Sequence, residues 1–259
     1  MTADPSADAP APLSPLEILR DDPPVLVVNK PAGLLTLGAK PGVATLERQV
    51  KEYLKARFQK AGNVYLGIPH RLDRPVSGVI LFARNSKGAA RLAEQFRERQ
   101  VRKVYWAVAE VPLSPPDGSL TDWLLKTTDQ AHVQVVAEGT PGAREATLQY
   151  RTLAQNGHGV LLEIELGTGR MHQIRVQLAA RVSPSVGDVQ YGASRLLLET
   201  PPADPTQNPI ALHAGSLTFL HPVRYDSVTV SAPLPANWAR LDFGGYGPSR
   251  AATAPEDWL

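Results

Sequence analysis

The stretch from Val160 to Leu166, VLLEIEL, places apolar side chains at every second position, with two glutamates among the residues between them. This period of two is typical of a β-strand that turns one face toward a core. It is the clearest of several β-like segments that follow one another between residues 102 and 168 without a helical period between them. Successive strands of this kind favour an α+β fold with antiparallel neighbours over a doubly wound parallel fold.

Around this region, short apolar runs alternate with helical periods. A helix is predicted over residues 44–58, where Leu46, Val50 and Leu54 share one face. A second helix is predicted after residue 85, with Ser86 as its N-cap. The predicted strands cover residues 25–29, 79–84, 105–111 and 160–166, with weaker ones at 132–136, 146–153 and 216–220.

Length and composition limit the possible domain organisation and the class of protein. The 259 residues are 43% hydrophobic and carry a net charge of only +2, which is ordinary for a globular chain. We expect a disordered lead-in at 1–16, one ordered domain at 17–243 and a tail at 244–259. The absence of cysteine excludes disulfides and thiol nucleophiles. No apolar run is long enough to cross a bilayer and no secretory signal is present, so a cytoplasmic location is expected.

A dense polar cluster, HRLDRPVSG, runs from His70 to Gly78 between two apolar segments. Its single carboxylate, Asp73, stands between Arg71 and Arg74, and neighbouring guanidiniums favour the ionised, nucleophilic form of a carboxylate at neutral pH. Taken alone, the cluster fits an ion-paired loop between two layers better than it fits a reactive site.

A second cluster, GTGRMHQIRVQ, covers Gly167 to Gln177 at the end of a predicted strand. Its two guanidiniums suit carboxylate pairing or phosphate binding, although a structural loop explains the cluster about as well. A lone His172 is more often a hydrogen-bonded structural residue than a catalyst. The histidines lack metal-ligand spacing, and no phosphate-binding loop is present, so neither a metal nor a cofactor is expected.

A third segment, RKVYW from Arg102 to Trp106, sets basic residues beside aromatic ones at the start of a strand. Rings that stack on bases and cations that meet phosphates are typical of nucleic-acid binding. Aromatic residues in a strand are nevertheless usually part of the core, and this segment alone favours that interpretation.

Together these segments resemble the RluA family of pseudouridine synthases. The similarity extends over about residues 24–233 and rests on several motifs in the family's order. His70 to Gly78 is similar to the family's His-Arg-Leu-Asp-x-x-Thr-Ser-Gly, except that Val76 replaces the threonine. Further matches are Val28–Leu34 (VNKPAGL), Lys103-x-Tyr105, Gly169–Arg175 (GRMHQIR), Gly187-Asp188 with Tyr191-Gly192, Leu212–Ala214 (LHA) and Phe219–Pro222 (FLHP).

The resemblance implies the pseudouridine synthase fold, an α+β fold with a mixed, mostly antiparallel central sheet, flanking helices and a cleft. It implies that Asp73 is the catalytic aspartate, that Tyr105 stacks on the target uracil and moves a proton, and that Arg175 pairs with Asp73. Arg71 would fill the space left in the RNA stack by a flipped-out base. The other residues expected to contact RNA or the base are Lys30, Leu72, Arg74, Lys103, Arg170, His172, Gln173 and Ile174.

The resemblance further implies an isomerase that converts uridines of structured ribosomal or transfer RNA to pseudouridine, without cofactor or metal and as a monomer. The small N-terminal S4 RNA-binding domain of some relatives is not expected here. Val76, Met171 and residues 182–186 depart from the family pattern, and the last two are expected to reshape the cleft wall. A catalytically inactive RNA-binding or chaperone protein is the alternative. A hydrolase with paired carboxylates is disfavoured because the hallmark segment holds only one.

Overall fold

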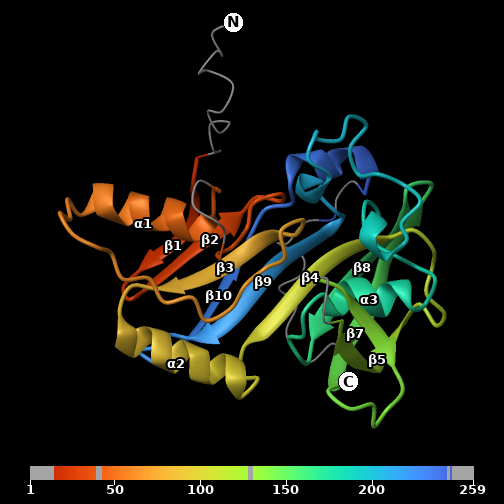
Figure 1. The fold of residues 1–259 in the computed structure, drawn as a ribbon, viewed down its shortest axis with the longest axis horizontal. Coiled ribbons are helices and arrows are strands. Elements are labelled where there is room, and N and C mark those ends of the chain that lie inside the picture. Colours follow the sequence, from red (N-terminus) through yellow and green to blue (C-terminus); the bar gives the residue numbers. More distant parts are fainter. Residues whose placement is uncertain (1–14, 39–42, 128–130, 244–245, 247–259) are drawn as a thin grey trace, which may run out of the picture.

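The computed structural model describes residues 15–38, 43–127, 131–243 and 246. One ten-stranded sheet runs through the molecule in the order β1-β2-β3-β9-β4-β8-β7-β5-β6, with β10 paired to β9 (Figure 1). Its strands are β1 (Glu17–Asp22), β2 (Val25–Lys30), β3 (Ser77–Ala83), β4 (Arg102–Ala109), β5 (Asp117–Lys126), β6 (Val133–Val136), β7 (Arg144–Asn156), β8 (Gly159–Leu166), β9 (Leu212–Leu220) and β10 (Ser227–Ser231).

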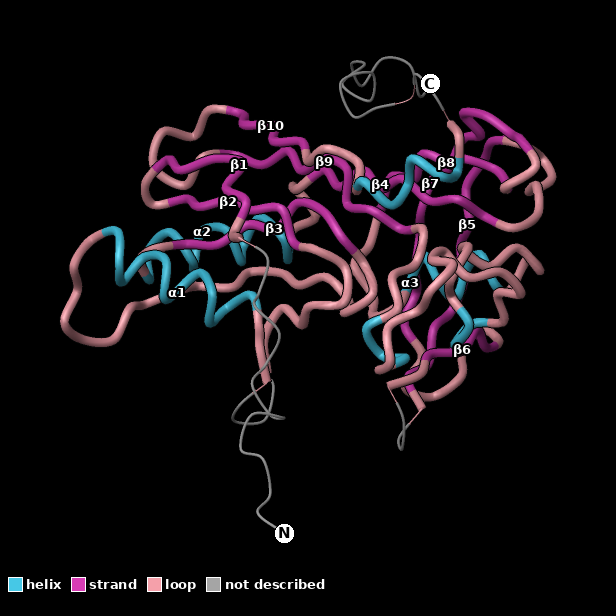
Figure 2. Tube along the Cα trace, turned by 90° about the horizontal axis from the view of Figure 1, so that it is seen from above, coloured by secondary structure: helices cyan, strands magenta, loops and turns pink. Residues whose placement is uncertain are grey.

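The described helices are few and short. They are α1 (Leu46–Arg57), α2 (Ser86–Arg97), α3 (Gln173–Ala179) and the 3-10 turns η1 (Val189–Tyr191), η2 (Pro205–Gln207) and η3 (Ala236–Leu241). Figures 1 and 2 show α1 and α2 beside the β1–β3 end of the sheet and α3 beside the β5–β8 end. No helix in the described part of the chain combines the length and apolarity that crossing a membrane requires.

The two long helices cover opposite faces of β2 and β3. Neighbouring residues of a strand point to opposite faces, and in β2 Leu26 packs with the buried face of α1, whereas Val27 packs with Leu92 of α2. The apolar face of α1 therefore packs against one side of the sheet, and the apolar face of α2 packs against the other. Thr45 caps α1 by accepting a hydrogen bond from the backbone N–H of Arg48.

The predicted fold class is confirmed: the sheet is mixed and mostly antiparallel. The strands at 102–168 form an uninterrupted antiparallel series, as their pattern predicted. The capping prediction for α2 was wrong by one residue, because the Asn85 carboxamide oxygen accepts from the Gly88 N–H at 2.7 Å and Ser86 is already helical. The sequence did not predict β1, β5, β10 or α3. The expected lead-in and tail lie outside the described residues, apart from residues 15, 16 and 246.

The centre of the sheet contains its one described parallel pairing. Strands β3 and β9 pair only through Ser77 with His213 and Gly78 with Ala214, and every other described pair is antiparallel. The HRLDRPVSG segment enters β3 at this point, so its loop is held over the middle of the sheet. A register shift between Val104 and Tyr105 in the neighbouring β4–β9 pair lies beside it. Such bulges re-aim side chains next to active sites.

Gly78 permits this close approach of β3 to β9. Its φ is +117°, and a Cβ at this position would lie 2.2 Å from the backbone oxygen of Ala214. We predict that Gly78→Ala lowers the free energy of unfolding by more than about 3 kcal/mol, measured by urea denaturation, because strain and a backbone clash add. Gly139→Ala is the matched control, since Gly139 has φ +80° and open space around it. A loss for Gly78→Ala no larger than for this control would contradict the argument.

Candidate active site

Two cavities meet at the loop that precedes β3. The larger has a volume of about 630 Å³ and is bounded by residues of this loop, the η1 turn and the η2 turn. The smaller, of about 70 Å³, is bounded by Tyr105 and by apolar side chains of the central core. Both are lined by Arg71, Leu72, Asp73, His172 and Arg175. These five residues therefore form the boundary between the two spaces.

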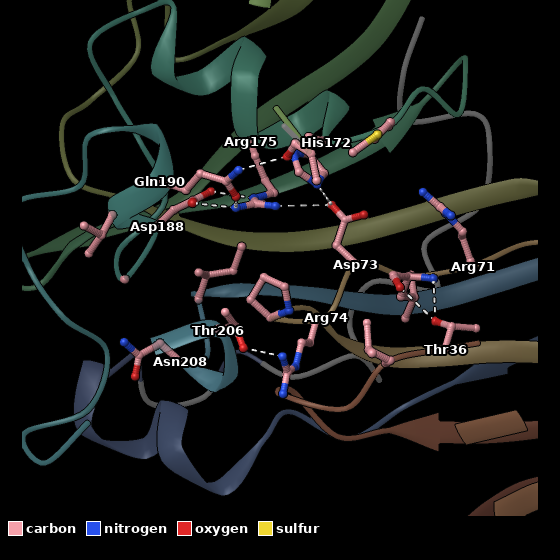
Figure 3. A pocket seen from close by; sticks show the side chains of 18 of the residues that line it. Thr36, Arg71, Asp73, Arg74, His172, Arg175, Asp188, Gln190, Thr206 and Asn208 are labelled. Carbon is pink, nitrogen blue, oxygen red and sulfur yellow. Dashed lines mark hydrogen bonds and ion pairs between the residues drawn. The ribbon is translucent and has the colours of Figure 1, made fainter. Parts of the chain in front are cut away.

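Asp73 is half-buried in this boundary, with 20% of its side chain exposed. Its Oδ2 atom lies 3.6 Å from Nη1 of Arg175 and 3.7 Å from Nε2 of His172 (Figure 3). The backbone carbonyl of Asp73 accepts from the N–H of Val76, which closes the turn. The turn needs no hydroxyl at position 76, and Val76 is instead buried in the core beneath the site.

Arg175 is fixed more tightly by another acid than by Asp73. Its Nε and Nη2 atoms donate to the two oxygens of Asp188 at 2.7 and 2.8 Å, and Nη2 also donates to Gln190 at 2.8 Å. Burial alone would lower the pKa of Arg175, but the hydrogen bonds and charge of Asp188, with the charge of Asp73, raise it. The guanidinium therefore stays charged although it is almost fully buried.

Lys30, expected to contact RNA, lies fully buried beneath the loop. Its ammonium donates to the carbonyls of Pro31, Leu34 and Arg74 at 2.9, 2.7 and 3.2 Å. Burial lowers the pKa of Lys30 to about 7, and the charge of Asp73 opposes the shift. Every ammonium hydrogen is used inside the protein, so the described position gives Lys30 a supporting role rather than an RNA contact.

Two more residues tie the loop to its surroundings. Thr36 exchanges hydrogen bonds with the backbone of Leu72, donating to its carbonyl at 2.8 Å and accepting from its N–H at 3.3 Å. Arg74 donates to the carbonyl of Gly33 at 2.9 Å and binds the η2 turn through Thr206 and Asp204 (Figure 3). Arg74, also expected to contact RNA, is thus occupied mainly in joining three loops.

Tyr105 and the expected apolar residues line the smaller cavity. Leu72, Ile174 and Leu212 are buried there, and the partly buried Leu166 also lines the cavity. Burial and the negative charge of Asp73 both raise the pKa of Tyr105, so its hydroxyl stays protonated at neutral pH. The pocket thus combines an aromatic ring, apolar walls and one carboxylate.

Basic side chains gather at one edge of the smaller cavity, which Arg170 lines and beside which Lys103 lies. Lys103 follows the same face of β4 as Tyr105, and its ammonium donates to the Thr168 carbonyl at 3.1 Å. Burial, then the charges of Arg99 and Arg170, lower the pKa of Lys103 to about 8. Burial and the charges of Arg144 and Arg99 likewise lower the pKa of Arg170. These cations repel one another, and phosphates would relieve that repulsion.

Arg71 and Gln173 differ sharply in exposure. Arg71 is exposed at the rim of both cavities and has no hydrogen-bond or ion-pair partner among the described residues. Gln173 is buried, and its carboxamide binds Thr168, the Arg170 N–H and the Thr147 carbonyl at 2.7 to 3.0 Å. Gln173 therefore shapes the turn before α3 from within, and only Arg71 of this pair is exposed to solvent.

Sequence reasoning gave no role to three residues of the site: Asp188, Gln190 and Tyr191. Asp188 and Tyr191 were quoted only as parts of a motif, and no local signal shows that they meet Arg175 across the fold. The Arg175 guanidinium carbon lies 4.9 Å from the Tyr191 ring centroid. Within the described ranges no group of three or more histidine, cysteine or acidic residues is arranged to hold a metal ion.

The model of the family described as RNA pseudouridylate synthase matches residues 24–180. An uncharacterised RNA pseudouridine synthase of Zymomonas mobilis is 32% identical over 90% of this chain and all of its own length. Ribosomal large subunit pseudouridine synthase D of Xylella fastidiosa is 35% identical over 88% of this chain and 68% of its own. The chain belongs to this family and is an RNA pseudouridine synthase, an isomerase.

Solved structures agree with this assignment. Human RNA pseudouridylate synthase domain containing 4 superposes with a TM-score of 0.69 at 25% identity, covering 87% of this chain and 92% of its own. Human RNA pseudouridylate synthase domain containing 1 gives a TM-score of 0.64 at 24% identity, over 88% of this chain and 86% of its own, and supports the fold.

The pairing of Arg175 with Asp188 predicts a large stability effect. Asp188→Asn leaves a buried guanidinium without its principal countercharge, which we expect to cost about 3 kcal/mol of unfolding free energy, measured by urea denaturation. Glu199→Gln is the matched control, because Glu199 pairs with Arg240 on the surface and is 84% exposed. Its stability should stay within experimental error of the wild type. Equal effects of the two substitutions would show that the buried pair is not a principal support.

Proposed function

We propose that this enzyme isomerises a uridine of structured ribosomal or transfer RNA, with Asp73 as the group that reacts with the ribose of a flipped-out nucleotide. The observation that supports this proposal is that Asp73 has no other unpaired acidic side chain beside it in the site. It is the one acidic residue among those described along the smaller cavity. The other acid that lines the larger cavity, Asp188, is 1% exposed and bound to Arg175. A mechanism with paired carboxylates has no second free acid here.

The proposed reaction needs only groups that this site contains. The N1–C1′ bond of uridine breaks while Asp73 attacks C1′ or removes the C2′ proton, and the freed uracil turns so that C5 bonds to C1′. The proton lost from C5 passes to solvent and N1 gains one, so the composition of the nucleotide does not change. The ring of Tyr105 would supply the stacking surface, and its protonated hydroxyl would take part in the proton transfer. No redox step or phosphoryl transfer occurs.

RNA binding is proposed along the basic edge. Extracting a uridine from its stack costs a few kcal/mol, least in loops and bulges, and phosphate contacts offset this cost. Lys103, Arg170 and the exposed Arg71 would make these contacts, and Arg71 would fill the emptied stack position. Leu72 and Ile174 would hold the base through apolar contact in the smaller cavity.

The first test replaces the proposed reactive group. Asp73→Asn keeps the size of the side chain but removes its charge, so we predict a loss of turnover of at least about 10³-fold. Tritium release from C5-labelled transcripts measures turnover, and gel shift measures RNA binding, which should persist. Asp117→Asn, at an exposed position outside both cavities, is the control and should remain active. Turnover by Asp73→Asn would rule out the mechanism, and a wild type that binds RNA but releases no tritium would support the inactive binder.

The second test uses the lowered pKa of Lys103, about 8. Lys103 is charged below this pH and neutral above it, so RNA affinity should fall as pH rises from 7 to 9.5. Lys103→Arg keeps its charge and should flatten this part of the profile. Fluorescence anisotropy at each pH measures the affinity. Lys87→Arg on α2, away from both cavities, should retain the wild-type profile. An unchanged profile in Lys103→Arg would show that Lys103 makes no phosphate contact.

A further inference from the structure

Tyr191 lies behind both side chains that approach Asp73. Its buried ring is 4.9 Å from the Arg175 guanidinium carbon and meets the His172 ring edge-on at 5.6 Å between centroids. The ring of His132 stacks on it at 4.8 Å. Tyr191 thus contacts the two groups that determine where the Asp73 carboxylate sits, although it lines neither cavity.

The hydroxyl of Tyr191 has two hydrogen-bond partners among the described residues. It accepts from the backbone N–H of Val133 at 3.0 Å, and it lies 2.8 Å from Nδ1 of His172. The backbone group can only donate. The one hydrogen of the hydroxyl is therefore available to the imidazole, and Nδ1 of His172 can accept it.

Two arguments give the His172 tautomer. If Nδ1 carried the hydrogen, the buried Tyr191 hydroxyl would have no acceptor for its own. The Nε2 lone pair would then face the Asp73 carboxylate at 3.7 Å. Both problems disappear when Nε2 carries the hydrogen. Burial lowers the pKa of His172 despite the charge of Asp73, which favours a neutral ring that holds one hydrogen. The second nitrogen of an imidazole is commonly set in this way by the partner of the first.

The backbone of His172 turns its ring toward Asp73. Its φ and ψ are 53° and 21°, in the left-handed region, and its side chain makes no capping bond to α3 although it occupies the N-cap position. Figure 3 shows the contacts from Arg175 and His172 ending on the same oxygen of Asp73. No described side chain donates to the other oxygen, Oδ1, which leaves it for the substrate.

We propose that Tyr191 is a positioning residue that fixes His172 as the Nε2–H tautomer, so that His172 and Arg175 together hold Oδ2 of Asp73 and present Oδ1 to the ribose. This inference rests on the proposed function of Asp73. The present 3.7 Å separation is an electrostatic contact, and contacts of this kind shorten when substrate closes a site. His172 would then donate to the carboxylate during the reaction and stabilise its charged form.

Two substitutions of His172 separate this role from a purely structural one. A glutamine carboxamide reaches the position of Nε2, whereas an asparagine carboxamide reaches only that of Nδ1. Asparagine tolerates the left-handed backbone better than glutamine does. A structural role therefore favours His172→Asn, and a donor role favours His172→Gln. We expect single-turnover rates at least about tenfold higher for His172→Gln than for His172→Asn, with equal RNA affinity.

Tyr191→Phe tests the origin of the tautomer. The variant keeps the ring beside Arg175 and removes only the hydroxyl. We expect ¹⁵N NMR of the imidazole to show the Nε2–H tautomer in the wild type and a mixture in Tyr191→Phe, with a lower single-turnover rate. Tyr150→Phe is the control, since the Tyr150 hydroxyl donates to the Pro115 carbonyl at 2.8 Å away from both cavities. It should lose stability and keep its rate.

The outcomes distinguish this inference from the proposed function. An Nδ1–H tautomer in the wild type, or a rate for His172→Asn equal to or above that of His172→Gln, overturns the role of His172 while tritium release still supports Asp73. An active Asp73→Asn variant overturns the function itself. The NMR result reports on the tautomer in either case, because it does not depend on turnover.

Discussion

The buried positive charge of Arg175 is the constraint on which the site depends. A guanidinium that is almost fully out of water needs countercharge and hydrogen-bond acceptors, and Asp188, Gln190 and Asp73 provide them. Asp188 takes the short bidentate contact, so Asp73 keeps a longer one. The arrangement gives Asp73 a permanently charged neighbour without making it the principal ion-pair partner, as its proposed role requires.

Much of the fold was predictable from patterning, and the exceptions have physical causes. The strands of the central core carry apolar side chains where the sheet buries them. Strand β5 has mostly polar or half-exposed residues, so its sequence lacks a clear period. Helix α3 is buried on almost every side. Gln173 and Arg175 enter the core because hydrogen bonds satisfy them, and Gln177 donates through its amide nitrogen although its Oε1 has no partner there. A helix without an exposed polar face has no amphipathic period to detect.

The site was predictable where motif residues reach the cavities, as Asp73, Tyr105 and Arg175 do. The site was less predictable where a charged side chain is buried within the protein. Lys30 looked like a surface cation because lysine is seldom fully buried, and only the fold brings three carbonyls to its ammonium. Asp188 could not be identified from spacing, since its pairing with Arg175 depends on the path of the chain after α3.

The larger cavity has a consequence for chemical intervention. It opens beside Asp73 but does not include Tyr105, and its walls combine apolar residues such as Leu35 and Ile210 with the polar groups of η1 and η2. A compact drug-like compound seated there would obstruct Asp73 without imitating a nucleoside. Met171 also lines this space, and it offers such a compound a soft, polarisable thioether contact.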